Sequence, residues 1–281
     1  MNIELLASFS FNIISDLKEM FLYQFMRNAF EAGTIIAIVA GLVGYFVVLR
    51  RLSFAGHALS HIGFAGAAGA ALLNFNPLAG LISFTISGGF FMALLGKKAV
   101  SRDVQIGIVL AFMLGLGVLF INLYKGYATE AYSLLFGQIL GISFASVKIT
   151  FWVSLFIIVL LAIYFRQLLF TTLDEEVAEA KGVSLLKLNL IMMFLIAIAV
   201  SIAVQIVGVL LIFSLLITPP AIAQRLTNSP VKGMFLASII GLLATWLGLF
   251  IGYYSPYPVS FFITSIVFVL YLLVRIYQKY F

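Results

Sequence analysis

The stretch RRLSFAGHALSHIGFAGAAGAAL, residues 50–72, contains both histidines of the chain, His57 and His61. Because they are four residues apart, a helix places both imidazoles on one face, one turn apart. Most residues around them are Gly, Ala and Ser, whose small side chains allow neighbouring helix backbones to approach closely. The stretch therefore predicts a membrane-crossing helix that carries a polar pair able to bind metal.

The composition of the whole chain is that of a membrane protein. Of its 281 residues, 64% are hydrophobic and 9% are charged, whereas about a quarter of the residues in a soluble domain are charged. Apolar runs repeatedly reach the roughly 20 residues that a helix needs to cross a bilayer. The short alternating segments of a transmembrane barrel are not visible. The fold class we expect is all-α, a polytopic helical membrane protein.

Nine membrane spans are predicted, or eight if residues 185–226 cross only once. They lie at about 21–49, 51–73, 78–96, 104–123, 146–165, 185–205, 208–226, 231–253 and 258–276. Residues 1–20 are expected to form an interfacial helix, and residues 21–281 a single membrane domain. The segment 124–143 is too interrupted for a span and is expected to be a short helix or a re-entrant piece.

The charge distribution gives the orientation. The net charge of +6 comes from 16 basic and 10 acidic residues, and the basic ones gather at the ends of the spans. Nine spans with the N-terminus outside and the C-terminus inside place most of the basic residues in the cytoplasm, as the positive-inside rule expects. This pattern favours a membrane orientation signal over nucleic-acid binding. The absence of Cys excludes disulfides and thiolate metal sites.

One polar loop, RQLLFTTLDEEVAEAKGVS, predicts a short cytoplasmic helix at residues 172–182. Thr172 and Glu175 have the spacing of a capping box, and Asp174 and Glu176 are acidic residues of the kind favoured at a helix N-terminus. Gly182 suits a left-handed cap at the other end. Such a helix is either a solvated loop element or a docking site for a soluble partner, and both interpretations stay open at this point.

Several blocks of the chain resemble the permease subunit of metal-ion ABC importers, the zinc/manganese/iron-chelate uptake family. They are RRLSFAGHALSHIGFAG, RDVQIGIVLAF, LLFGQILGIS and QIVGVLLIFSLLITPPAIAQRL, in that order, and the similarity covers about residues 22–275. The resemblance implies a type II ABC-importer-like permease in the bacterial cell (inner) membrane. It also implies a homodimer, two cytoplasmic ATPase subunits and an extracytoplasmic metal-binding protein. Because the chain lacks GxxxxGK[ST], we expect ATP hydrolysis in a separate chain, and neither enzyme activity nor a bound cofactor here.

The resemblance also implies roles for particular residues. His61 takes the place of a metal-contacting histidine, and His57 stands where the family typically has Asp. Imidazole ligands favour zinc, with manganese or iron as alternatives. Pro219 and Pro220 would provide either a hinge or a static bend. The ATPase-coupling residues implied in the 172–182 helix are Asp174, Glu175, Glu176, Ala178, Glu179 and Gly182.

The sequence also allows other functions. A secondary transporter or an ion channel could also use a histidine-lined path, and an importer of a vitamin or siderophore would leave the pair without a metal role. The pair could equally be satisfied by backbone carbonyls or serine hydroxyls of neighbouring helices. An intramembrane protease is disfavoured because neither HExxH nor a GxSG serine is present.

Overall fold

The computed structural model describes residues 13–94, 99–124, 137 and 139–280, and every regular element in this part is helical, which confirms the all-α prediction. Residues 1–12 of the predicted interfacial helix and most of the predicted outer segment 124–143 lie outside the described residues. The elements are α1 (Ile13–Met20), α2 (Gln24–Leu49), α3 (Ser53–Leu72), α4 (Pro77–Leu94), α5 (Ala99–Leu123), η2 (Ile139–Gly141), α7 (Phe144–Leu173), α8 (Glu175–Ala180), α9 (Leu185–Leu226), α10 (Pro230–Tyr253) and α11 (Val259–Tyr280).

The number of spans differs from the prediction. By length and composition, seven of the described helices are able to cross a membrane, rather than nine. Two helices account for the difference. The 20 residues of α3 are mostly Gly, Ala, Ser and His, and α3 is not among the seven candidate spans. Helix α9 counts as one helix of 42 residues although its backbone is interrupted at Gly208.

The interruption in α9 turns the chain back on itself. A straight helix of this length would measure about 63 Å, twice the hydrocarbon thickness of roughly 30 Å. Gly208 has φ 82° and ψ 164°, a conformation that glycine adopts far more readily than other residues. Ile196, before the break, and Leu216, after it, both lie next to Gly56, at 3.9 and 3.1 Å from the position that a Cβ atom there would take. The two halves therefore lie side by side, and the break falls inside the predicted junction at 205–208.

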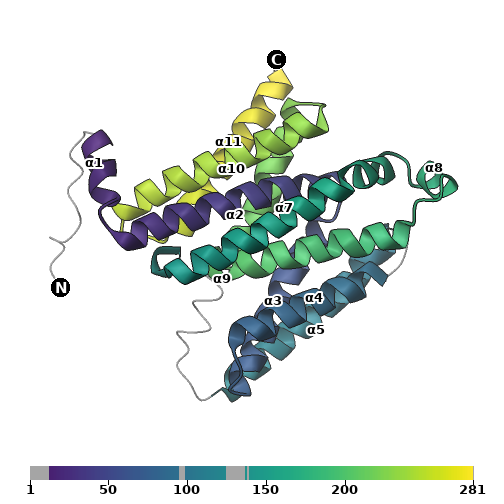
Figure 1. Cartoon of the computed structure of the whole chain (residues 1–281), viewed down its shortest axis with the longest axis horizontal. Coiled ribbons are helices and arrows are strands. Elements are labelled where there is room, and N and C mark those ends of the chain that lie inside the picture. Colours follow the sequence, from purple (N-terminus) through teal and green to yellow (C-terminus); the bar gives the residue numbers. More distant parts are fainter. Residues whose placement is uncertain (1–12, 95–98, 125–136, 138, 281) are drawn as a thin grey trace.

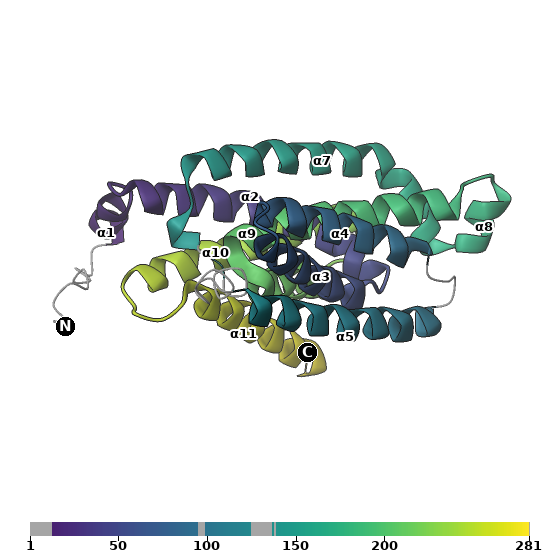
Figure 2. The same ribbon diagram turned by 90° about the horizontal axis from the view of Figure 1, so that it is seen from below.

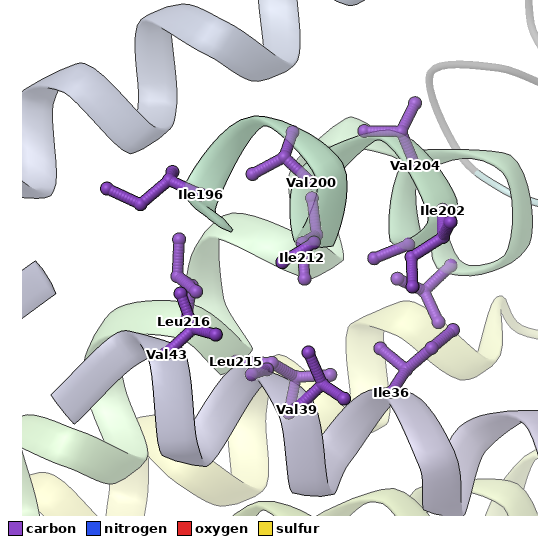
Figure 3. Close-up of a cluster of buried hydrophobic side chains, with 14 of the residues drawn as sticks. Ile36, Val39, Val43, Ile196, Val200, Ile202, Val204, Ile212, Leu215 and Leu216 are labelled. Atoms are coloured by element: carbon purple, nitrogen blue, oxygen red, sulfur yellow. The ribbon is translucent and has the colours of Figure 1, made fainter. Parts of the chain in front are cut away.

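The hydrophobic core is centred on α9. Figure 3 shows side chains from both halves of α9, including Val200 and Ile212, directed toward Val39 and Ile36 of α2. In the perpendicular view, α9 lies between α7 on one side and α11 on the other (Figure 2). Because α9 is enclosed by other helices, most of its side chains belong to the core.

The loop helix α8 lies at the end of the molecule opposite α1 (Figure 1). It is shorter than predicted, and the predicted capping box is wrong. Helix α7 continues to Leu173, and the Thr172 hydroxyl donates to the Leu168 carbonyl within it at 2.6 Å. Asp174 is the actual cap, accepting a hydrogen bond from the Val177 amide at 3.0 Å. The left-handed cap at Gly182 is confirmed by its φ of 83°.

Candidate functional site

The histidine-bearing helix α3 is held closely by its neighbours because its packing faces carry glycines. A Cβ atom at Gly63 would come within 2.5 Å of the Thr85 hydroxyl of α4, and one at Gly56 would lie 3.1 Å from Leu216 of α9. Small residues permit such close approach between membrane helices, where packing supplies much of the association energy. The position of α3, and with it that of the histidines, is therefore fixed by both α4 and α9.

The two imidazoles contact each other. The ring centroids of His57 and His61 are 4.6 Å apart with an interplanar angle of 82°, an edge-to-face arrangement. The ring of Phe213, in the second half of α9, lies 4.6 Å from that of His57 and is tilted by 56°. Both histidines are half-buried. The spacing of four residues thus produces the pair that the sequence predicted, with an aromatic ring against one member.

Both histidines have an unsatisfied nitrogen. The Nδ1 atoms of His57 and His61 are buried, and the described residues offer neither of them a hydrogen-bond partner. The nearby hydroxyl of Ser60 donates instead to the Gly56 carbonyl in its own helix, at 3.1 Å. A buried polar atom without a partner costs about 1–3 kcal/mol. The contacts therefore do not support the interpretation in which serine hydroxyls or carbonyls satisfy these atoms. In the tautomer that leaves Nδ1 without hydrogen, its lone pair would be available to a cation.

A single chain supplies only part of a ligand set. In the described part of the chain, no group of three or more His, Cys, Asp or Glu residues lies close enough to hold a metal ion. Structural zinc sites have four ligands and catalytic ones have three from the protein. Two imidazoles alone match a transient site on a transport path better than a permanent one.

The residues predicted to couple to an ATPase lie elsewhere, on and beside α8. The carboxylate-bearing residues are exposed, whereas Ala178 is fully buried. Two apolar side chains, Leu173 and Val177, are 77% and 43% exposed. The structure thus keeps this set apart from the histidine pair and presents an acidic surface with apolar residues in it. The exposed carboxylates belong to Asp174, Glu175, Glu176 and Glu179.

The two prolines lie inside the second half of α9 and are buried. The non-helical dihedral angles in this helix occur at Gly208 rather than at Pro219 or Pro220. The hinge role of the prolines stays a prediction. Phe213 is the site residue that the sequence did not indicate, because nothing local marks a phenylalanine of an apolar helix as the neighbour of a distant histidine.

Comparison with known proteins gives the family. Residues 22–278 match the ABC 3 transport family. The manganese import system permease protein ScaB of Streptococcus gordonii is 34% identical over 232 residues, which are 82% of this chain and 83% of that protein. The high-affinity zinc uptake system membrane protein ZnuB of Buchnera aphidicola subsp. Baizongia pistaciae is 33% identical over 244 residues, covering 85% and 94%.

A solved structure agrees with these relatives. A chain of PsaBC from Streptococcus pneumoniae, determined in complex with a Fab, superposes with a TM-score of 0.83 at 32% identity, over 93% of this chain and 95% of that one. The match therefore extends over nearly the whole chain. This chain belongs to the ABC 3 transport family and is the multi-pass permease subunit of a metal-ion ABC importer of the bacterial cell membrane.

Proposed function

We propose that this permease moves a divalent metal ion into the cytoplasm past His57 and His61, and that it prefers zinc to manganese. The observation that carries the proposal is the contact of the two imidazoles, each with a buried and unpartnered Nδ1 atom. Nitrogen ligands suit zinc, whereas manganese is better matched by oxygen ligands. Relatives include a manganese permease and a zinc permease, so the preference is argued from the ligands rather than from the family.

The working unit is a homodimer in this proposal. If the α3 helices of two copies face each other across the dimer axis, four imidazoles surround one ion. Four nitrogen ligands suit the tetrahedral geometry of zinc. The same arrangement explains why one chain holds only two of the ligands. A transport site must also release its ion, so we expect weaker binding and faster exchange than at a structural zinc site.

Two further partners are proposed. Two cytoplasmic ATPase subunits hydrolyse ATP, and one of them docks on α8 of each permease copy. An extracytoplasmic metal-binding protein delivers the ion. The exposed Leu173 and Val177 among four carboxylates would fit a groove with an apolar floor and basic residues at its rim. Residues 1–20 are proposed to lie along the membrane surface, next to the single permease domain of residues 21–281.

The experiment is metal uptake by the complex reconstituted in proteoliposomes, with zinc and manganese in competition. We expect ATP-dependent uptake in which zinc displaces manganese, and loss of uptake in His61→Ala. Ser60→Ala is the matched control, because the Ser60 hydroxyl bonds only to its own helix. Wild-type uptake by His61→Ala would refute the pathway, and displacement of zinc by manganese would refute the metal preference alone.

A further inference from the structure

A hydrogen bond between Arg50 and Asn189 joins two segments of the chain that have different roles. The Nη2 atom of Arg50, at the end of α2, donates to the Oδ1 atom of Asn189 in the first turns of α9, at 2.9 Å and partly buried. A guanidinium presents its donors in a fixed planar geometry and remains charged at any physiological pH. This contact therefore fixes the relative position of the two segments more strictly than apolar packing does, since apolar packing is not directional.

On one side, Arg50 is tied to the start of the histidine helix. Arg50 caps α2, its amide donating to the Phe46 carbonyl at 2.9 Å, and Arg51 adopts a left-handed φ of 55°. The Leu52 amide returns to the Val47 carbonyl at 2.7 Å, and α3 begins at the next residue. The turn is short and fully hydrogen-bonded, so a displacement of Arg50 displaces the first turn of α3.

On the other side, Asn189 is tied to the loop helix. After α8, Gly182 and Val183 donate to the carbonyls of Glu179 and Ala178 at 2.9 and 3.0 Å, and Ser184 caps α9 by accepting from the Lys187 amide at 3.4 Å. Only residues 181–184 connect α8 to α9. Because Val183 bonds back to the last turn of α8 and Ser184 caps α9, we expect a partner that moves α8 to move the first turns of α9 as well.

Near the histidines, α9 also contacts α3 directly. Ile196 and Leu216 lie next to Gly56, and the ring of Phe213 lies against His57. These contacts are apolar and belong to the two halves of α9. The Arg50–Asn189 bond is a polar link between the first turns of α9 and the turn that leads into the histidine helix.

We propose that Arg50 and Asn189 are positioning residues that transmit movement of α8 to the helix bearing His57 and His61, so that ATP hydrolysis and metal transfer stay coupled. The inference rests on the proposed function, because it needs an ATPase that acts on α8 and a metal that passes the histidines. Neither residue touches the ion in this mechanism. Breaking the bond should lower the metal moved per ATP rather than abolish ATP hydrolysis.

The test measures zinc uptake and ATP hydrolysis in the same proteoliposomes containing the whole complex. Asn189→Leu keeps the size of the side chain and removes the acceptor, and Asn189→Asp keeps an acceptor for Arg50. We expect Asn189→Leu to hydrolyse ATP normally and to move less zinc per ATP by about fivefold or more. Asn189→Asp should keep the wild-type ratio. A purely structural role would lower both activities together.

Arg50→Leu removes the donor of the same bond. This variant replaces Asn189→Leu in the test if the complex with Asn189→Leu fails to assemble. The double variant should move as much zinc per ATP as Arg50→Leu alone, because the loss of the Asn189 acceptor changes little once its donor is gone. A wild-type ratio in the leucine variants would overturn the inference, as would an equal loss in Asn189→Asp. A wild-type complex that hydrolyses ATP and moves no zinc would instead overturn the proposed function on which the inference rests.

Discussion

Gly44 of α2 lies directly against the carbonyl oxygen of Leu216 in α9, so closely that a methyl group on Gly44 would overlap this oxygen. Leu216 is four residues before Pro220, which has no amide hydrogen to donate to that carbonyl. The proline therefore frees an acceptor, and the glycine allows α2 to cover it. This contact gives Pro220 a structural role in the packing of α2 on α9.

We predict that Gly44→Ala destabilises the protein. The obstacle is main chain, which cannot rotate away as a side chain could, so α2 and α9 must separate. Overpacking of this kind costs about 1–3 kcal/mol. Thermal unfolding in detergent should show a lower midpoint than the wild-type protein.

The matched control is Gly115→Ala in α5, where a Cβ atom would meet nothing within 4 Å. Alanine is also favoured over glycine inside a helix by about 1 kcal/mol. The control should therefore unfold at or slightly above the wild-type temperature. If Gly44→Ala unfolded at the same temperature as the control, the close approach of the two helices would be wrong.

The sequence predicts the membrane helices well because their length is set by the bilayer. The break in α9 is also predictable, since a glycine interrupts an apolar run that is too long for one crossing. The end of α7 is not predictable in this way. The predicted span stops at Arg166, whereas the helix continues to Leu173. A charged residue marks the end of the apolar segment, whereas a helix can extend into water beyond it.

The candidate site also contains one contact that the sequence predicts and others that it does not. The contact between His57 and His61 follows from local spacing, which the helix repeat fixes. The contact between His57 and Phe213 depends on how α9 folds back beside α3, and the Arg50–Asn189 bond depends on the same packing. Such pairs are distant in sequence and carry no local pattern, so they appear only in the folded structure.

We predict that Leu173→Ser combined with Val177→Ser weakens the binding of the ATPase subunits. Both side chains are exposed, so the folded permease should lose no more than about 0.5 kcal/mol per position. The lost apolar contact should instead be seen in the amount of ATPase that co-purifies with the permease.

The control for this surface is Tyr257→Ser, which removes a side chain that is 66% exposed in the turn between α10 and α11. This turn lies near α1, since the ring of Tyr253 at the end of α10 is 6.4 Å from that of Tyr23, whereas α8 lies at the opposite end of the molecule (Figure 1). The control should retain full ATPase binding. Full recovery of the ATPase with the double serine variant as well would contradict a docking role for α8.

We predict that Phe213→Ala lowers the apparent affinity of the permease for zinc without unfolding it. The Phe213 ring packs against His57 and restricts the orientations that the imidazole can adopt. Loss of a residue that orients a metal ligand costs about tenfold or more in metal affinity. The zinc concentration for half-maximal uptake should rise by that factor.

Leu210→Ala provides the comparison, because Leu210 lies in the same half of α9 and is 53% exposed. It loses apolar surface but no aromatic ring that packs on an imidazole, so its half-maximal zinc concentration should stay at the wild-type value. Equal zinc dependence in the Phe213 and Leu210 variants would show that the ring does not orient His57.

We predict that His57→Asp shifts the metal preference toward manganese. The substitution replaces an imidazole nitrogen with carboxylate oxygens one helical turn from His61, and oxygen ligands suit manganese better than nitrogen ligands do. The zinc-to-manganese uptake ratio should fall by about tenfold, which corresponds to about 1.4 kcal/mol. Zinc need not be excluded, since divalent zinc binds most mixed sites more tightly than manganese does.

His57→Asn separates the effect of the ligand from that of side-chain shape. The amide has nearly the size of the carboxylate and no negative charge, so uptake of both metals should decline while the ratio stays nearer that of the wild type. A change in ratio with Asp and a common loss with Asn would identify His57 as a ligand. If Asp and Asn both left the wild-type ratio and rate, His61 would have to meet the ion without its neighbour, and the argument for zinc from a pair of imidazoles would fail.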